Sequence, residues 1–420
     1  MNKVTQITVV IMLSTLVAGQ ALASAANDLQ RAKNTAISKQ ISASADWRHL
    51  IQYTSRLFGG VSSEIKSQQS FFASNGSTDP QRELIATLEA MFLPLKVGES
   101  PDAHPRCEFI ARYEFLNDLI DFPDEVDSID CIRFKQWVSS EKVDSISLVF
   151  ASGYFKNPAS FYGHPLLKFN MGNAAIGGLL DTTINNGAIV PANENPVVYM
   201  IRGIFGGYEA AFSDTKFYRL NHSYSESDLR DLWDYQLDLT QAQKKRVIYY
   251  SWELLGQRFT YKFFSNNCGY FLEDLLQYAL GKRISPRNRL YTVPSNTFFN
   301  LMETTNNGKP LVKNIVPTAS RHSRLNENYA ALNKPAQAAV HNYLRTQSIA
   351  QSFDQDQQRK IIDTLTDYYS FLISKSDNQD RNKEYTTKRT MLYAKRLRLK
   401  KTPLVTNHKA SSTAPHTGSR

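Results

Sequence analysis

The apolar pattern of the chain changes its period at about residue 145, and this change limits the fold more than any other feature. Before it, Asp79-Pro80 opens a segment whose apolar residues Leu84, Leu88 and Met91 have helical spacing, which predicts a helix. After it, Ser145 to Ala151 is rich in residues that favour strands. The chain is therefore expected to have an α+β fold, in which helices precede a sheet and further helices follow it.

Several elements are expected after this point. Glycine residues and turn sequences separate the apolar runs, so the sheet should contain at least four strands. The three further strands are expected at residues 162–169, 182–190 and 197–203, and the helices near Ser225 to Tyr235, from Thr240 to Gly256 and from Cys268 to Ala279, where Gly281 ends the last helix.

These patterns divide the chain into five regions. They are a signal peptide (1–25), a helical N-terminal region (26–144), an α+β domain (145–325), a C-terminal helical region (326–400) and a disordered basic tail (401–420).

The first residues have the composition of an export signal. Lys3 gives a positive start, Ile7 to Gly19 is apolar, and small residues follow, so cleavage is expected after about Ala23 or Ala25. A membrane-spanning helix needs about 20 apolar residues, and neither this run nor any later segment is apolar for long enough. A retained membrane anchor is the alternative. We expect a soluble or peripheral protein of the periplasm or the extracellular space.

Positive charge is concentrated at the C-terminal end. From Arg381 to Arg420 there are eleven Lys or Arg and one acidic residue, Glu384, which gives +10, and the whole chain of 420 residues also carries +10. In the periplasm the anionic partners are lipid headgroups and envelope polymers rather than nucleic acid. Peripheral contact of this arm with an anionic membrane is one expectation, and a solvated tail is the other.

The chain has three cysteines. Export makes a disulfide plausible, and Cys107 and Cys131 are close enough in sequence to form one, which would stabilise the fold by about 3 to 3.5 kcal/mol. A disulfide to Cys268 and three buried thiols are the alternatives. If Cys107 pairs with Cys131, Cys268 is the remaining thiol.

The sequence around Cys268 is typical of a helix start. Asn266 and Asn267 precede it and an apolar helix follows. The pKa of a thiol, about 8.5, falls at a helix N-terminus, and the N–H groups there, with an asparagine amide, are suited to positioning or to holding an oxyanion. Cys268 is therefore a candidate nucleophile. A small buried cysteine is the structural alternative.

His164 is the candidate base. It follows Gly163 and begins a strand that is otherwise apolar, whereas the other seven histidines lie in predicted helices, loops or the tail. A hydrogen-bonded core histidine is the alternative. No metal or cofactor is expected, because the His, Cys and carboxylate positions lack ligand spacing and no glycine-rich phosphate loop is present.

Several motifs resemble those of the Lnb N-terminal periplasmic domain family over about residues 40–320. They are Asn157 to His164 with Leu167 and Phe169, Gly203 to Phe212, Leu229 to Tyr235, Tyr261 to Cys268, and the earlier Cys107 with Arg112-Tyr113. The order of histidine strand and cysteine helix is also similar to permuted papain-like folds of the NlpC/P60 and lecithin:retinol acyltransferase groups.

This resemblance implies a permuted papain-like core with an antiparallel sheet, a histidine strand and a cysteine at a helix N-terminus. It also implies an acyl-transfer or amide-cleaving enzyme, and some members of the family N-acylate lipoproteins. His164 and Cys268 stand at the matching positions. Asn185 is the candidate for the group that orients the imidazole, with Asn186 or Asp181 as substitutes. The chain departs from a lipoprotein acyltransferase in having no hydrophobic membrane segments.

The expected function is thus a periplasmic, cysteine-dependent acyl transfer to or from a cell-envelope lipid or lipoprotein, by an acyltransferase or an amidase. A hydrolase of peptidoglycan peptides would use the same two residues. A non-catalytic envelope interaction protein, with Cys268 structural, is the third possibility.

Overall fold

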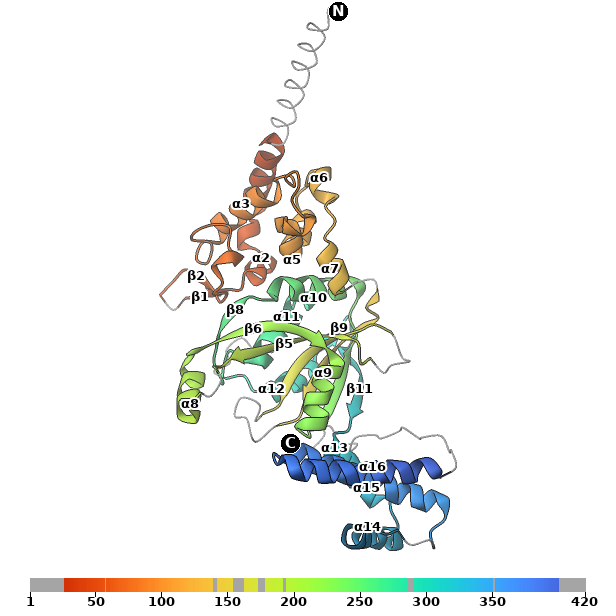
Figure 1. Cartoon of the computed structure of the whole chain (residues 1–420). Helices are drawn as coiled ribbons and strands as arrows, with labels where there is room; N and C mark the ends of the chain where they lie inside the picture. Colours follow the sequence, from red (N-terminus) through yellow and green to blue (C-terminus); the bar gives the residue numbers. More distant parts are fainter. Residues whose placement is uncertain are drawn as a thin grey trace, which may run out of the picture. The chain divides into compact units, whose positions relative to one another are not determined.

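The computed structural model describes residues 26–56, 58–138, 142–153, 162–172, 178–191, 194–285, 291–349 and 352–399 (Figure 1). The predicted signal peptide, the predicted tail and the motif residues 157–161 lie outside these ranges. The chain forms two compact units. The first takes its described residues from Met1–Val143, Asn186–Ser213 and Leu239–Leu290, and the second from Asp144–Asn185, Asp214–Asp238 and Tyr291–Arg420.

The main sheet of the described residues has the strand order β11-β7-β3-β4-β5-β6-β8. Its registered pairs are antiparallel, which confirms the α+β expectation. The division between the two units falls inside β5 and β6. The strands are β3 (Ser145–Ala151), β4 (His164–Asn170), β5 (Thr182–Ile189), β6 (Tyr208–Lys216), β7 (Leu232–Leu237), β8 (Arg258–Tyr261) and β11 (Val312–Thr318).

One predicted strand is a helix. The run 197–203 lies in α8 (Pro196–Phe205), although its valines and isoleucine favour strands. Asn195 caps this helix by accepting hydrogen bonds from the N–H groups of Val197 and Val198, and Gly206 ends it in the left-handed conformation. The start and stop signals therefore outweigh the strand propensity of the residues between them.

The predicted helix near Ser225 to Tyr235 is also wrong. A π-helical turn, η7 (His222–Ser227), follows α9 (Phe217–Asn221), and the chain then enters β7. β7 pairs with β3 on one side and β11 on the other. Pairing with two neighbouring strands therefore decides the conformation of β7. The sequence predicted only helices after the first strands, whereas β7, β8 and β11 all follow that point.

In the second unit, both faces of the sheet are covered. The buried cluster on one face joins Val149, Leu166 and Leu232 to Phe217 of α9. On the other face the ring of Phe298, in α12 (Pro294–Glu303), lies 4.9 Å from that of Phe150. The C-terminal region is helical as expected and has its own core around Leu365. Its helices are α13 (Arg321–Ala330), α14 (Lys334–Thr346), α15 (Gln355–Lys375) and α16 (Gln379–Arg398).

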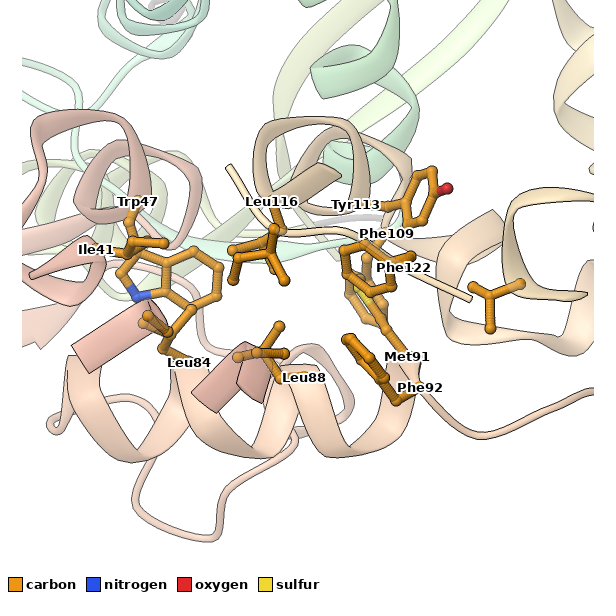
Figure 2. Packing of buried hydrophobic residues seen from close by; sticks show 14 of the residues in the cluster. Ile41, Trp47, Leu84, Leu88, Met91, Phe92, Phe109, Tyr113, Leu116 and Phe122 are labelled. Atoms are coloured by element: carbon orange, nitrogen blue, oxygen red, sulfur yellow. The ribbon is translucent and has the colours of Figure 1, made fainter. Parts of the chain in front are cut away.

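In the first unit, an N-terminal core is built from helices (Figure 2). Leu84, Leu88 and Met91 of α3 (Pro80–Met91) face this core, and the Asp79 side chain caps the helix, as the sequence predicts. Trp47 of α2 (Ala45–Leu50) and Leu116 of α5 (Ile110–Asn117) pack in the same core.

The predicted disulfide between Cys107 and Cys131 is confirmed. It joins α4 (Pro105–Glu108) to the start of α7 (Ile132–Trp137). The remaining helices of this unit are residues 26–38, α6 (Asp124–Asp127), α10 (Gln241–Leu254) and α11 (Cys268–Leu280). The short elements of the chain are η1 (Ile41–Ala43), η2 (Gln68–Ser70), η3 (Pro101–Ala103), β1 (Tyr53–Ser55), β2 (Val61–Ser63), β9 (Thr305–Asn306) and β10 (Lys309–Pro310).

A buried arginine ties the N-terminal helices to α10. The Arg112 side chain is 1 % exposed and lies between two buried carboxylates, 2.5 Å from Glu253 Oε1 and 3.5 Å from Glu83 Oε1. Glu83 comes from α3 and Glu253 from α10, so the three charges join α3, α5 and α10. Burial of such a group is tolerated only where every charge has a partner.

Candidate active site

His164 is the first residue of β4 and is held by the neighbouring strand. Its Nε2 lies 2.5 Å from Oδ1 of Asn185 in β5. Lys168 is opposite Thr183 in the register, and side chains two apart share a face of a strand, so His164 and Asn185 project from the same face. The spacing of the two strands therefore brings this pair together.

The hydrogen bond fixes the tautomer of the imidazole. An amide oxygen only accepts, so Nε2 carries the proton and donates it, and Nδ1 keeps its lone pair. Burial lowers the pKa of His164 to about 4, the hydrogen bond to Asn185 opposes this shift, and the positive charge of Arg230 adds to it. The imidazole is neutral at pH 7 and can accept a proton at Nδ1.

The residues around His164 explain the glycine before it. Gly163 has φ 87°, and a Cβ there would lie 2.2 Å from the ring of Phe150. No side chain larger than hydrogen at position 163 is compatible with this packing.

Arg230 comes from the turn before β7 and donates to the carbonyls of Ala151 and Ser152 at the end of β3. It also lies against an aromatic ring that faces the histidine. Its guanidinium carbon is 4.6 Å from the centre of the Tyr224 ring, and that ring is 6.0 Å from the imidazole of His164. Arg230 stands in a motif noted for the family resemblance, but nothing in its sequence context indicated that it faces the histidine.

The two substitutes for Asn185 are placed differently. Asn186 follows it in the strand and projects from the opposite face, where its amide is fully buried and has no hydrogen-bond partner among the described residues. Asp181 accepts a hydrogen bond from the N–H of Met171. The contact to His164 is made by Asn185.

Cys268 is the first residue of α11, as predicted, and is 2 % exposed. It belongs to the first unit and lies outside the disulfide. Gly281 ends the helix in the left-handed conformation. Phe271, Leu272 and Leu275 are buried and anchor this helix in its unit. The thiol is therefore held at a helix N-terminus, where a negative charge is stabilised.

The side chains of Asn266 and Asn267 hold the turn that carries the thiol. Asn267 Oδ1 accepts from the N–H groups of Gly269 and Tyr270, and its Nδ2 donates to the Phe263 carbonyl over 2.8 Å. Asn266 Nδ2 donates to Glu64. Both amides are thus occupied in hydrogen bonds that fix the turn.

Glu64 is a buried acid beside this turn that the sequence did not indicate. Its carboxylate accepts from Asn266 Nδ2 at 3.2 Å and from the Tyr270 hydroxyl at 2.9 Å. Burial raises the pKa of Glu64 to about 7, and the hydrogen bond from Tyr270 opposes the shift. Glu64 follows β2, about 200 residues before its partners, so no local pattern could have identified it.

Tyr261, the last residue of β8, is also near Cys268. Burial raises the pKa of its hydroxyl well above the usual value, and the charge of Cys268 raises it further. A neutral phenol therefore lies close to the thiol. His164 and Asn185 are in the second unit, and Cys268 with Asn266, Asn267, Glu64 and Tyr261 is in the first.

Two known domain families match parts of the chain. Residues 133–304 match the Lnb N-terminal periplasmic domain family. The predicted resemblance to this family is confirmed over these residues, whereas Cys107, Arg112 and Tyr113 lie outside the match, and the similarity to papain-like folds stays a prediction. The Lnb match contains His164, Asn185 and Cys268, and its periplasmic description agrees with the expected compartment. Residues 39–119 match a domain of unknown function, DUF7843, so Glu64 stands in one match and its partners Asn266 and Tyr270 in the other. No curated protein and no solved structure matches the chain.

The described ranges contain neither a metal-binding cluster nor a helix able to span a membrane. Across the part of the chain that the structure describes, no group of three His, Cys, Asp or Glu side chains is arranged to hold a metal ion. None of the helices in the same ranges is long and apolar enough to cross a bilayer.

Proposed function

We propose that the protein is an exported, cysteine-dependent acyl-transfer enzyme of the cell envelope, with Cys268 as nucleophile and His164 as base. The observation that carries the proposal is the bond from His164 to Asn185, because it leaves Nδ1 of a neutral imidazole as proton acceptor. A thiol at a helix start supplies the nucleophile. Cleavage of the signal peptide after about Ala23 or Ala25 is part of this proposal.

The proposed reaction has two steps. In the first, Nδ1 of His164 takes the proton from the Cys268 thiol, the sulfur bonds to a carbonyl carbon, and the leaving alcohol or amine receives that proton as its bond breaks. In the second, water or an amine attacks the thioester and gives its proton to His164, the carbon–sulfur bond breaks, and His164 returns that proton to the departing sulfur of Cys268. Asn185 orients the imidazole throughout, and Asn266 and Asn267 position the turn of Cys268.

The low pKa of His164 predicts the resting state. An imidazole whose pKa is about 4 is unprotonated at pH 7 and does not hold the thiol proton before substrate is bound. The resting enzyme therefore holds a neutral imidazole, and proton transfer to it accompanies attack on the carbonyl. Because the Cys268 thiol is only 2 % exposed and His164 does not take its proton before substrate binds, simple alkylation is a weak test of its role as nucleophile.

A better test uses p-nitrophenyl esters as acyl donors. Wild-type protein is expected to release a burst of nitrophenolate equal to its own concentration and to gain the mass of the acyl group on the peptide of Cys268. Cys268→Ala and His164→Ala are expected to abolish the burst, whereas His341→Ala, an exposed histidine of α14, serves as the matched control. A burst that survives in Cys268→Ala, or a wild type that shows none with short or long esters, contradicts the proposal.

The natural substrate is proposed to be an envelope lipid or lipoprotein. The mass of an adduct on Cys268 in protein isolated from cells distinguishes the classes. An acyl chain indicates a lipid donor, and a muropeptide fragment indicates the peptidoglycan hydrolase instead.

A further inference from the structure

Helix α8 exposes nearly all of its apolar side chains. Val197, Ile201 and Phe205 are 58, 54 and 78 % exposed, and Met200 and Ile204 are exposed as well. At 100° per residue, the exposed apolar positions cover an arc of about 160° around the helix. Exposed apolar surface of this breadth on one element marks a site of interaction.

The opposite face of α8 is attached to the turn that carries Cys268. The N–H of Phe263 donates to the Gly203 carbonyl over 2.8 Å, and a Cβ on Gly203 would lie 2.2 Å from the Phe263 ring. That ring also contacts Tyr199, with centres 5.2 Å apart. The Phe263 carbonyl accepts from Nδ2 of Asn267, which caps the helix of Cys268. α8 and the nucleophile turn are therefore joined through one residue.

The Arg202–Glu194 ion pair and Lys262 stand beside the apolar arc of α8. Arg202, its one charged residue, stands at the rim of the apolar arc, and its guanidinium lies 3.1 Å from Glu194. The stem of Lys262 lies along the backbone at Gly206, directly after the helix. Phe264, the next residue but one after Lys262, is 52 % exposed. Cations beside apolar and aromatic side chains match the boundary between anionic headgroups and acyl chains.

The shape of α8 favours a bilayer over a protein partner. A helix that enters a protein groove presents a narrow stripe, whereas lipid chains accept a broad apolar arc without a matching surface. Ten residues are about 15 Å long, too short to span a bilayer, so the helix would lie in its interface. In Figure 1, α8 stands next to the start of β6, and its apolar side chains are exposed there.

We propose that α8 is a membrane-docking helix, which lies in the headgroup region of an anionic phospholipid bilayer and holds the Cys268 turn at the lipid surface. This inference goes beyond acyl transfer, because docking requires no chemistry. An inactive Cys268→Ala protein is expected to bind membranes as the wild type does.

The test is flotation of the full chain with vesicles of equimolar phosphatidylethanolamine and phosphatidylglycerol at high salt, which screens the basic C-terminal arm. Wild type and Cys268→Ala are expected to float. The double variant Ile201→Ser, Phe205→Ser is expected to partition about tenfold to a hundredfold less, because two large apolar side chains no longer enter lipid. Its matched control is Leu93→Ser, Val97→Ser, which removes exposed apolar residues elsewhere in the same unit.

A second measurement locates the helix. Tryptophan placed at position 205 (Phe205→Trp) is expected to be quenched by brominated lipid, whereas Val97→Trp is not. The proposal is overturned if wild type stays unbound at high salt, or if the Ile201→Ser, Phe205→Ser variant floats as well as its control. It is also overturned if wild type is a dimer that this variant dissociates, because a second copy then covers α8. The variant should retain the burst with soluble esters, so failure of docking and failure of acyl transfer are separate results.

Discussion

Nε2 of His164 donates a hydrogen bond to Oδ1 of Asn185 over 2.5 Å. This contact joins the first residue of β4 to a residue of β5 on the same face of the sheet, and it leaves Nδ1 as the basic nitrogen. The direction of the bond matters because the imidazole has two nitrogens, and the bond determines which of them can receive a proton.

Without Asn185, the imidazole of His164 should no longer be held in one tautomer. In Asn185→Ala we expect His164 to occupy both neutral tautomers, seen as averaged ring ¹⁵N shifts, and the ester burst to slow about 10- to 100-fold, part of the usual contribution of a positioned base. Asn186→Ala is the matched control, since this neighbouring asparagine projects from the opposite face. If Asn185→Ala changes neither the ring shifts nor the burst, Asn185 does not position the base.

The buried His164 should make stability fall with acidity. Its pKa is about 6.5 in the unfolded chain and about 4 in the folded protein, so between these values protons bind mainly to the unfolded chain. From about pH 7.5 to about pH 4.5 the free energy of unfolding of wild type should drop by about 1 to 3 kcal/mol more than that of His164→Gln. Urea unfolding at both pH values measures the difference, and equal slopes for the two proteins would refute it.

Local signals predicted the elements that carry the candidate residues. Ser145 to Ala151 is a strand because its residues favour one, and Thr240 begins a helix because its side chain and that of Gln243 form a capping box. Gly281 ends α11 because glycine readily adopts the left-handed conformation. The pairing of Cys107 with Cys131 followed from compartment and spacing. For these features a few neighbouring residues contain the whole physical cause.

Tertiary pairing decided the features that the sequence did not predict. Leu232 to Leu237 is a strand because β3 and β11 flank it, and neither partner is near it in sequence. Glu64 lies at the cysteine turn because Asn266 and Tyr270 donate to it from about 200 residues away. Arg230 reaches the end of β3 in the same manner. Contacts between distant segments leave no periodic pattern, which is why these residues were missed.

The contribution of Glu64 to the free energy of unfolding should change with pH in the opposite direction to that of a salt-bridged acid. Its folded pKa of about 7 lies above the unfolded value of 4.5, so the folded protein binds the proton more tightly, and stability is lost as pH rises through this interval. We expect Glu64→Gln to be more stable than wild type by about 1 to 3 kcal/mol at about pH 8 and no more stable below about pH 4. Glu99→Gln, an exposed acid, is the control. A Glu64→Gln protein that is less stable at alkaline pH would contradict this prediction.

Arg112 should be costly to remove by itself. Arg112→Met leaves the carboxylates of Glu83 and Glu253 buried without their cation, and removing one partner from such a cluster costs about 3 to 5 kcal/mol. The triple variant with Glu83→Gln and Glu253→Gln should recover most of that loss, since no buried charge remains. Denaturant unfolding of both variants decides the matter: a triple variant as unstable as Arg112→Met would mean that lost packing, and not unpaired charge, accounts for the effect.

The basic C-terminal arm should add a second, salt-sensitive contribution to membrane binding. α16 packs on α15 through the buried Leu392, so removing the helix would disturb a core, whereas Arg381, Lys383 and Arg398 are exposed and can be neutralised in place. Each cation near an anionic surface contributes about 1 kcal/mol at low salt. Neutralising all three to Gln should therefore weaken binding to phosphatidylglycerol vesicles at low salt and leave the binding at high salt unchanged, because the latter depends on apolar residues of α8. Binding that is equally reduced at both salt concentrations would show that the two surfaces do not act independently.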